Sequence, residues 1–416
     1  MFLDKPDPSH EPPQKSRRWT LPLPPVGSGE TLEGVEVLSE RPDAIGLQLF
    51  ERLRDVLLWM HTPEDLRGSL FVHRSVVNDS SLLPNGVAEP VGELWRLTHQ
   101  QLTADEVAAA CSRVSTWAYE RGHLRIATSY AYAAATVKPE EPELAFAVGR
   151  STRDAGRLAH AEAWFQRTAG LARKKRNREM LTAAYFGSGV VHEIRGDHAA
   201  ACRTFEKALR TASVGGLNRM TAIAHQYLIP LTLNDYQKAF GHAAAALDLC
   251  PPDDPQLARI AIDAGAMFSE HSHFSLAYEL YEAALPHVTR VSDRLACFAN
   301  ICRASAALGL KRRFAEGWSE IDRIALGPAP LLYAESLVEL AHGLITLRYW
   351  KDAARVLLDA EEKDSQSAVA VKIAHLREVI EGRKEGDINR PAAADAVEFT
   401  AGLTNRLSNL ALQAPG

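Results

Sequence analysis

Two histidines separated by one residue, His271 and His273, are the first side chains whose type and spacing suggest chemistry. Imidazole nitrogens bind zinc and other transition metals when three or four ligands converge on one point. Side chains two positions apart on a helix point in different directions, so this pair could chelate an ion only from a loop. No set of cysteine and acidic ligands accompanies them. We therefore interpret both as polar residues of a turn and predict no metal site.

A run of basic residues from Arg173 to Arg178 is the second candidate. Such clusters can contact phosphates. However, no aromatic residue that could stack on a base is interleaved with the charges, and positive side chains are favoured at the C-terminal ends of helices. We interpret this run, and a shorter one at residues 311–313, as solvated helix ends, and we expect no nucleic-acid binding.

Sequence motifs of catalysis and cofactor binding are missing from the chain. It has no Walker A sequence, no GxGxxG, no GxSxG and no HExxH. Five cysteines without a CxxC pair are interpreted as small buried hydrophobic residues: Cys111, Cys202, Cys250, Cys297 and Cys302. We predict no enzyme, no catalytic residue and no cofactor. A strongly perturbed acid–base pair in a folded pocket would revive an enzymatic interpretation.

The composition is that of a soluble globular protein. Of 416 residues, 46% are hydrophobic and 24% charged, and the formal net charge is −5. This charge creates no global attraction to nucleic acid or to anionic membranes. No apolar run approaches the roughly 18–20 residues that span a bilayer, and the N-terminus does not resemble a signal peptide. We expect a cytoplasmic protein without a membrane segment.

The first hundred residues contain three segments that differ in composition and in hydrophobic pattern. Residues 1–30 are rich in proline and charge, which predicts a disordered or extended arm. Residues 42–60 have apolar positions at helical spacing, whereas residues 61–92 read as a loop with short helices. Thr103 and Glu106 form a capping box that predicts the start of a helix. Residues 31–104 thus form a helical N-terminal segment of unknown role.

A repeated pattern begins after this capping box, and its clearest copy covers residues 185–209. One helix carries Tyr185, Gly189 and His192, a Gly-Asp turn follows, and a second helix carries Ala201 and Phe205. Two antiparallel helices approach closely where small residues face each other, and a ring fills the space beside them. This unit resembles a tetratricopeptide repeat.

The resemblance extends over residues 105–364. Turns are expected near residues 122, 156, 196, 234, 272, 312 and 348, spaced by 34 to 40 residues. The minimal repeat is about 34 residues, so these units are similar to the longer repeats of tetratricopeptide regulators and of many bacterial proteins of that superfamily. The resemblance implies an all-α fold, a right-handed superhelical solenoid of about seven helical hairpins. Residues 365–383 are predicted to be a capping helix, and residues 384–416 a tail that either packs back or stays free.

The same resemblance implies where a partner binds. In tetratricopeptide arrays the first helix of each hairpin lines a concave groove that takes extended or helical peptides. Counting in the repeat frame gives eleven groove-facing residues, and eight of them are our candidates for partner binding: Tyr119, Phe146, Arg150, Arg153, Phe186, Val190, Glu193 and His225. Arg150 and Arg153 make the early groove partly cationic, which suits an acidic peptide or a C-terminus. Pro230 is expected to kink the first helix that contains it.

The sequence therefore predicts a protein- or peptide-binding scaffold. The alternative is a peptide-responsive regulatory sensor in which the N-terminal segment acts on an effector. A position of that segment across the groove would favour the regulator. A position against the first repeat would favour the scaffold.

Overall fold

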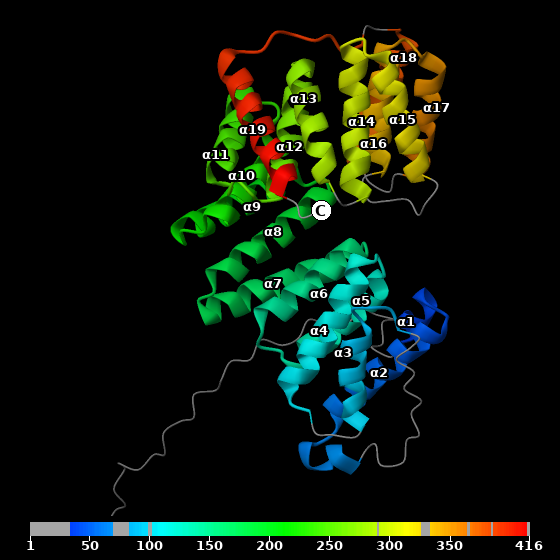
Figure 1. Cartoon of the computed structure of the whole chain (residues 1–416), viewed down its shortest axis with the longest axis vertical. Helices are drawn as coiled ribbons and strands as arrows, with labels where there is room; N and C mark the ends of the chain where they lie inside the picture. The colour runs from blue at the N-terminus through cyan, green and yellow to red at the C-terminus, as the bar shows by residue number, and fades with distance from the viewer. Residues whose placement is uncertain are drawn as a thin grey trace, which may run out of the picture. The chain divides into compact units, whose positions relative to one another are not determined.

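The computed structural model describes residues 34–69, 83–98, 102–288, 291–325, 333–363, 367–383 and 386–413 (Figure 1). The arm predicted at residues 1–30 lies outside these ranges. All regular structure within them is helical, which confirms the predicted all-α class. The chain divides into two compact units, Met1–Ser151 and Thr152–Gly416. In the described part of the chain, no helix combines the length and apolarity needed to cross a membrane.

The first unit begins with short helices and ends with a long pair. Its elements are α1 (Val35–Glu40), α2 (Ala44–His61), η1 (Glu64–Ser69), α3 (Ala88–Trp95), η3 (Arg96–Thr98), α4 (Ala104–Glu120) and α5 (Leu124–Val137). Helix α6 (Pro142–Asp154) crosses the division between the units. The helix predicted at residues 42–60 is α2, and the irregular stretch after it contains η1 and α3.

Helix α4 starts at the predicted capping box. The backbone N–H of Thr103 donates to the Glu106 carboxylate at 2.8 Å, and the N–H of Glu106 donates to Oγ1 of Thr103 at 3.3 Å. These bonds satisfy two donors that the first turn would otherwise leave unpaired. The bond from Thr103 also lowers the pKa of Glu106, which stabilises its ionised form.

The N-terminal segment packs against the α4–α5 pair. The Glu40 carboxylate, at the end of α1, accepts N–H bonds from Arg125 at 3.2 Å and Ile126 at 2.8 Å, in the first turn of α5. The hydroxyl of buried Tyr130 in α5 donates to the carbonyl of Leu49 in α2 at 2.7 Å. The segment of unknown role therefore shares one buried core with the first helical pair.

The second unit is a series of helical hairpins. After α7 (Leu158–Lys175) come α8 (Arg178–Ile194), α9 (His198–Val214), α10 (Asn218–Leu228), α11 (Tyr236–Leu249), α12 (Gln256–Glu270), α13 (Phe274–Ala284), α14 (Val291–Ala307), α15 (Lys311–Ala325), α16 (Tyr333–Thr346) and α17 (Trp350–Lys363). The pairs α8–α9, α10–α11, α12–α13, α14–α15 and α16–α17 each pack closely. We call α8, α10, α12, α14 and α16 the first helices, and their partners the second helices.

The hairpin turns share one backbone motif. Gly196 has a φ of 75°, and the next N–H, that of Asp197, donates back to the His192 carbonyl at 2.9 Å. The left-handed residue followed by this long backward bond is the Schellman motif, which favours glycine because it lacks a Cβ. The same motif occurs at Gly122, Gly156, Ser272, Gly309 and Arg348. The turn expected near residue 312 is therefore at Gly309, because that glycine supplies the left-handed conformation and α15 already starts at Lys311.

Close helix approach depends on small residues, as the repeat pattern predicts. A Cβ at Gly189 of α8 would lie 2.5 Å from the ring of Phe205 in α9. A Cβ at Gly265 of α12 would lie 2.6 Å from the ring of Tyr281 in α13. Both rings are fully buried, so the missing side chain makes room for the aromatic core.

One hairpin departs from the pattern at Pro230. Helix α10 ends at Leu228, and the chain continues as the 3-10 helix η4 (Pro230–Thr232) before α11. Proline cannot donate an N–H and its ring collides with the preceding turn. The predicted kink is thus an interruption of the first helix.

The C-terminal residues fold back onto the middle of the second unit. Helix α18 (Ser367–Glu381) packs against α16 and α17, and α19 (Ala394–Gln413) packs against α12 and α13. Figure 1 shows α19, in red, lying across these green helices. Of the two possibilities for the tail, packing back is the one observed.

Candidate ligand-binding surface

The first helices of the second unit are joined by polar side chains. Gln226 of α10 donates to Asp263 of α12 and accepts from the Gln256 amide at 2.8 Å. Arg259 of α12 lies 3.4 Å from the Asp293 carboxylate of α14. Because these residues come from alternate helices, they define one face of the unit, which we call the first-helix face.

Glu193 of α8 belongs to this set but has no hydrogen bond or ion pair among the described residues. Its half-buried carboxyl interacts electrostatically with Asp263 and Arg259 of α12. Together with Asp293, this group holds three carboxyl groups and one guanidinium. We call Glu193, Gln226, Arg259, Asp263 and Asp293 the open cluster, because its negative charge exceeds its positive charge.

Both interior carboxyl groups of the open cluster hold protons unusually tightly. Burial, reinforced by the negative charge of Asp263, raises the pKa of Glu193 to about 7. Burial raises the pKa of Asp263 to about 6, against the opposing effects of Arg259 and the Gln226 amide. A cation beside these groups would favour their ionised forms.

A second charged group on the same face is fully paired. Arg303 of α14 is buried and binds Glu270 of α12 at 2.9 Å, Glu339 of α16 at 2.9 Å and Asp387 at 2.8 Å. Burial alone would raise the pKa of Glu339, but the Arg303 guanidinium holds it below its usual value. We call Arg303, Glu270, Glu339 and Asp387 the closed cluster.

The groove candidates of the first unit contact one another. The guanidinium carbon of Arg150 lies 4.2 Å from the ring centre of Tyr119, a cation–π arrangement. Both side chains are half-buried, as is Phe146. These three residues remain candidates for partner contact.

The groove candidates of the second unit do not form one group, and each has its own contacts. Arg153 forms an ion pair with Asp154 at 2.6 Å. Phe186 is buried and its ring lies 5.6 Å from that of Tyr227, which comes from the next first helix. Val190 is half-buried beside the same core. His225 shares a hydrogen bond of 2.9 Å between Nδ1 atoms with His242 of α11.

The histidine pair considered first has structural partners. Nε2 of His271 bonds the Leu233 carbonyl at 2.8 Å, and both rings meet the Tyr236 ring edge-on. His273 precedes α13 and reaches the Arg390 carbonyl. Within the described ranges, no group of three His, Cys, Asp or Glu side chains could hold a metal ion.

The remaining sequence candidates also have local contacts. Arg173 donates to the Tyr185 hydroxyl at 3.0 Å, and Arg178 donates to the Val214 carbonyl at 3.0 Å. Four cysteines are buried and Cys202 is half-buried. Burial raises the pKa of the Cys250 thiol to about 11 and that of Cys297 and Cys302 to about 12, so these thiols stay protonated and unreactive.

The repeat frame identified Glu193 but missed Arg259, Asp263 and Arg303. Each of these charged residues interrupts an otherwise apolar stretch of a first helix, which is the signal available in the sequence. A charged residue in an apolar stretch can be recognised from the sequence as unusual. Its interaction partners cannot be recognised, because they lie on other hairpins.

Comparison with known proteins gives structural matches only. No protein-family model and no curated protein matches the sequence. A solved structure of a Rap protein complexed with Competence and Sporulation Factor is 12% identical with a TM-score of 0.45, over 82% of this chain and 87% of that one. A chain of the APC/C Cut9–Hcn1 hetero-tetramer is 13% identical with a TM-score of 0.48, over 83% of this chain and 57% of that one.

A third match, PilF of Pseudomonas aeruginosa, is 16% identical with a TM-score of 0.39, over 56% of this chain and 97% of that one. At such identities and scores the similarity carries no argument about function. The matched structures are of proteins that contain tetratricopeptide repeats. In its described ranges the chain is an all-α protein of paired helices.

Proposed function

We propose that the protein is a cytoplasmic scaffold that binds a segment of another protein across the first-helix face of its second unit. The observation that carries this proposal is the open cluster, where the half-buried Glu193 carboxyl has no hydrogen-bonding partner in the described chain. A half-buried carboxyl that already interacts with a second carboxyl binds a positively charged donor more favourably than an exposed carboxyl does. A ligand that supplies such a donor would gain free energy at this position.

The charge of the open cluster sets the chemistry of that ligand. Three carboxyl groups face one guanidinium, so a lysine or arginine side chain of the bound segment would reduce the excess of negative charge. Val190 lies nearly one helical turn before Glu193 on α8 and offers an apolar contact beside the charge. A charged anchor flanked by apolar contacts is the usual composition of a binding hot spot.

The cationic candidates, Arg150 of the first unit and Arg153 of the second, remain part of the proposal. Arg150 and Arg153 would contact acidic groups of a ligand, as the sequence suggested. The packing of the N-terminal segment on α4 and α5 favours the scaffold over the regulatory sensor.

The perturbed pair Glu193 and Asp263 also meets one condition for acid–base catalysis, a pKa near neutrality. Catalysis further needs a nucleophile, a metal or an oxyanion-stabilising group beside the pair. The immediate neighbours, Gln226 and Arg259, are already engaged by Asp263 and Asp293. Recognition of a cation therefore accounts for the cluster better than catalysis.

A photo-crosslinking amino acid placed at Val190 of the full chain tests the scaffold in source cells. We expect it to capture a protein that the same probe at Leu358, an exposed residue of second helix α17, does not capture. The captured segment, made as a peptide, should bind about tenfold more weakly to Glu193→Gln at pH 8, since one charge pair is lost. Equal capture from both positions, or unchanged affinity, would refute the proposal.

A further inference from the structure

The second helices offer a surface that the proposed function does not use. Helix α19 lies in a furrow with second helices α11 and α13 as walls and first helix α12 as floor. Phe399 of α19 packs against Phe240 of α11 and Phe268 of α12, with ring centres 5.5 and 6.3 Å apart. Leu403 shares the buried cluster with Ala243 and Leu280.

Polar contacts fix both ends of α19 in this furrow. The Arg390 N–H donates to the Ser272 carbonyl at 2.7 Å before the helix begins. At the other end, Arg406 donates to the carbonyl of Leu247 at 2.6 Å and to that of Cys250, both at the C-terminal end of α11. The chain itself thus shows that a furrow between second helices accepts an amphipathic helix.

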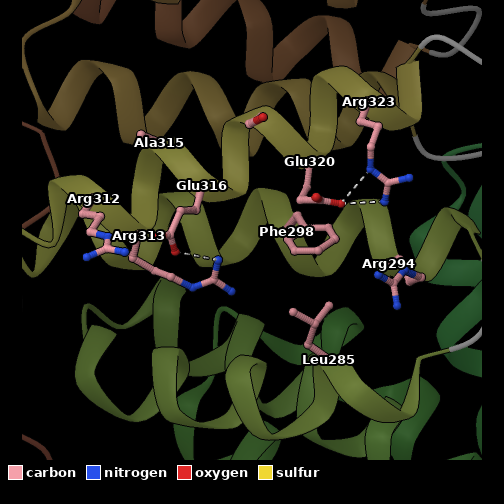
Figure 2. Close-up of a pocket in the computed structure, with 10 residues that line it drawn as sticks. Leu285, Arg294, Phe298, Arg312, Arg313, Ala315, Glu316, Glu320 and Arg323 are labelled. Atoms are coloured by element: carbon pink, nitrogen blue, oxygen red, sulfur yellow. Dashed lines mark hydrogen bonds and ion pairs between the residues drawn. The ribbon is translucent and has the colours of Figure 1, made fainter.

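The next furrow along the hairpins is not occupied by any helix in the described part of the chain. A hollow of about 870 Å³ lies between the end of α13, continued by η5 (Leu285–His287), and helices α14 and α15. Leu285 of η5 bounds it on one side and α15 on the other, with Arg294 and Phe298 of α14 between them, so it lies one hairpin further along the chain than the α19 furrow. Figure 2 shows Phe298 and Leu285 between two pairs of arginines, Arg312 with Arg313 and Arg294 with Arg323.

The size of the hollow suits a helix. Its lining residues on α15 run from Arg312 to Arg323. At 1.5 Å per residue this stretch is roughly 16 Å long, about three helical turns. The ring of Phe298 and the side chains of Leu285 and Ala315 are its apolar lining.

The charged residues that line this hollow are four arginines and two glutamates. Arg313 of α15 forms an ion pair with Glu282 of α13, and Arg323 forms one with Glu320 on its own helix at 2.6 Å. The half-buried Arg294 guanidinium lies 5.7 Å from the ring centre of Phe298 and helps to lower the pKa of Glu320, but it forms no ion pair within 4 Å of a described residue. A cation without a close ion-pair partner beside an aromatic ring indicates a negatively charged ligand group.

We propose that this furrow docks an amphipathic helix of a partner protein, with apolar side chains on Phe298 and Leu285 and carboxylates toward Arg294 and Arg323. Helix-in-groove recognition reads apolar anchors spaced by three and four residues. The arginines at the rim select acidic flanks and reject basic ones. This surface is formed by second helix α15, Leu285 of η5 and two residues of first helix α14, and it includes no residue of the open cluster.

A displayed library of 20-residue helices tests the proposal, with a fixed Leu/Phe stripe and randomised flanks, selected on the full chain. We expect selected helices to carry Asp or Glu on both flanks. Their affinity should fall about tenfold for Arg294→Gln/Arg323→Gln, and Ala315→Trp should abolish binding by filling the hollow. Arg355→Gln, an exposed arginine of second helix α17, is the matched control and should change nothing.

Three results would overturn the proposal. The selected helices could carry basic or uncharged flanks, or none of them could depend on Arg294 and Arg323. Inorganic phosphate at millimolar concentration could displace them completely, which would indicate a small-anion site. Glu193→Gln should leave the binding of the helices unchanged, so failure of this proposal and failure of the proposed function are distinguishable. Retention of the wild-type thermal transition by each variant establishes that it is folded.

Discussion

Arg303 and Glu193 lie on the same face of the second unit, yet their surroundings differ. Arg303 is buried and meets three carboxylates within 2.9 Å. Glu193 is half-buried and has no hydrogen bond or ion pair in the described chain. The comparison indicates that the closed cluster holds hairpins together, whereas the open cluster keeps unsatisfied charge at a surface that a partner can reach.

The largest expected effect comes from breaking the closed cluster. Arg303→Met removes the cation shared by Glu270, Glu339 and Asp387. Among the described residues, Glu339 then keeps one ion pair, with the Lys372 ammonium at 4.0 Å. Removal of one partner of a buried ion pair costs about 3–5 kcal/mol. Urea unfolding at pH 7 should show this loss. A loss below about 1 kcal/mol would mean that the closed cluster is no more structural than the open one.

The open cluster should respond to pH in the opposite way to an ordinary carboxylate. The folded state holds the Glu193 proton up to a pKa of about 7, whereas the unfolded chain releases it near the ordinary glutamate pKa of 4.5. The folded state therefore binds more protons in this window, and its stability falls as pH rises from about 4.5 to about 7. Glu193→Gln removes this dependence and should be about 1–3 kcal/mol more stable than wild type at pH 8.

Denaturant unfolding at pH 5 and pH 8 measures this difference. Glu279→Gln, which changes an exposed carboxyl on second helix α13, is the matched control and should leave the profile unaltered. Parallel wild-type and Glu193→Gln profiles would show that Glu193 is solvated like a surface residue.

The contact between the closed cluster and the C-terminal segment gives an intermediate effect. Asp387→Asn removes the ion pair that joins Arg303 to the chain before α19, although Glu270 and Glu339 remain. We expect a loss of about 1–2 kcal/mol, since the guanidinium keeps two of three partners. Hydrogen exchange in residues 394–413 should become faster. Unchanged exchange in these residues would show that the closed cluster does not stabilise the packing of α19.

Local features of this fold could be predicted from the sequence because their causes are local. The capping box at Thr103, the turn glycines at 122, 156 and 196, and the interruption at Pro230 each follow from one or two residues. The close contact of Gly189 with Phe205 follows from the small–aromatic pattern of one hairpin.

The clusters could not be predicted because their members lie on different hairpins. Arg303 and Asp387 are 84 residues apart, and Glu193 meets Asp263 only when α8 and α12 are placed together. Phe186 illustrates the same limit, because the repeat frame puts it on a first helix but Tyr227 of the next first helix covers it. The position of α19 likewise depends on a furrow that three other helices create.

The smallest change in stability is expected for Asp293→Asn, which tests whether Asp293 belongs to the open cluster. Asp293 pairs with Arg259 at 3.4 Å, where both side chains are partly exposed, and its charge also raises the pKa of Asp263. Asp293→Asn loses a weak attraction and relieves a repulsion, so stability at pH 7 should change by less than about 0.5 kcal/mol. The pKa of Asp263, followed by NMR titration, should fall. A loss above about 2 kcal/mol would place Asp293 in a structural network like that of Arg303, and the open cluster would then be confined to Glu193, Asp263, Gln226 and Arg259.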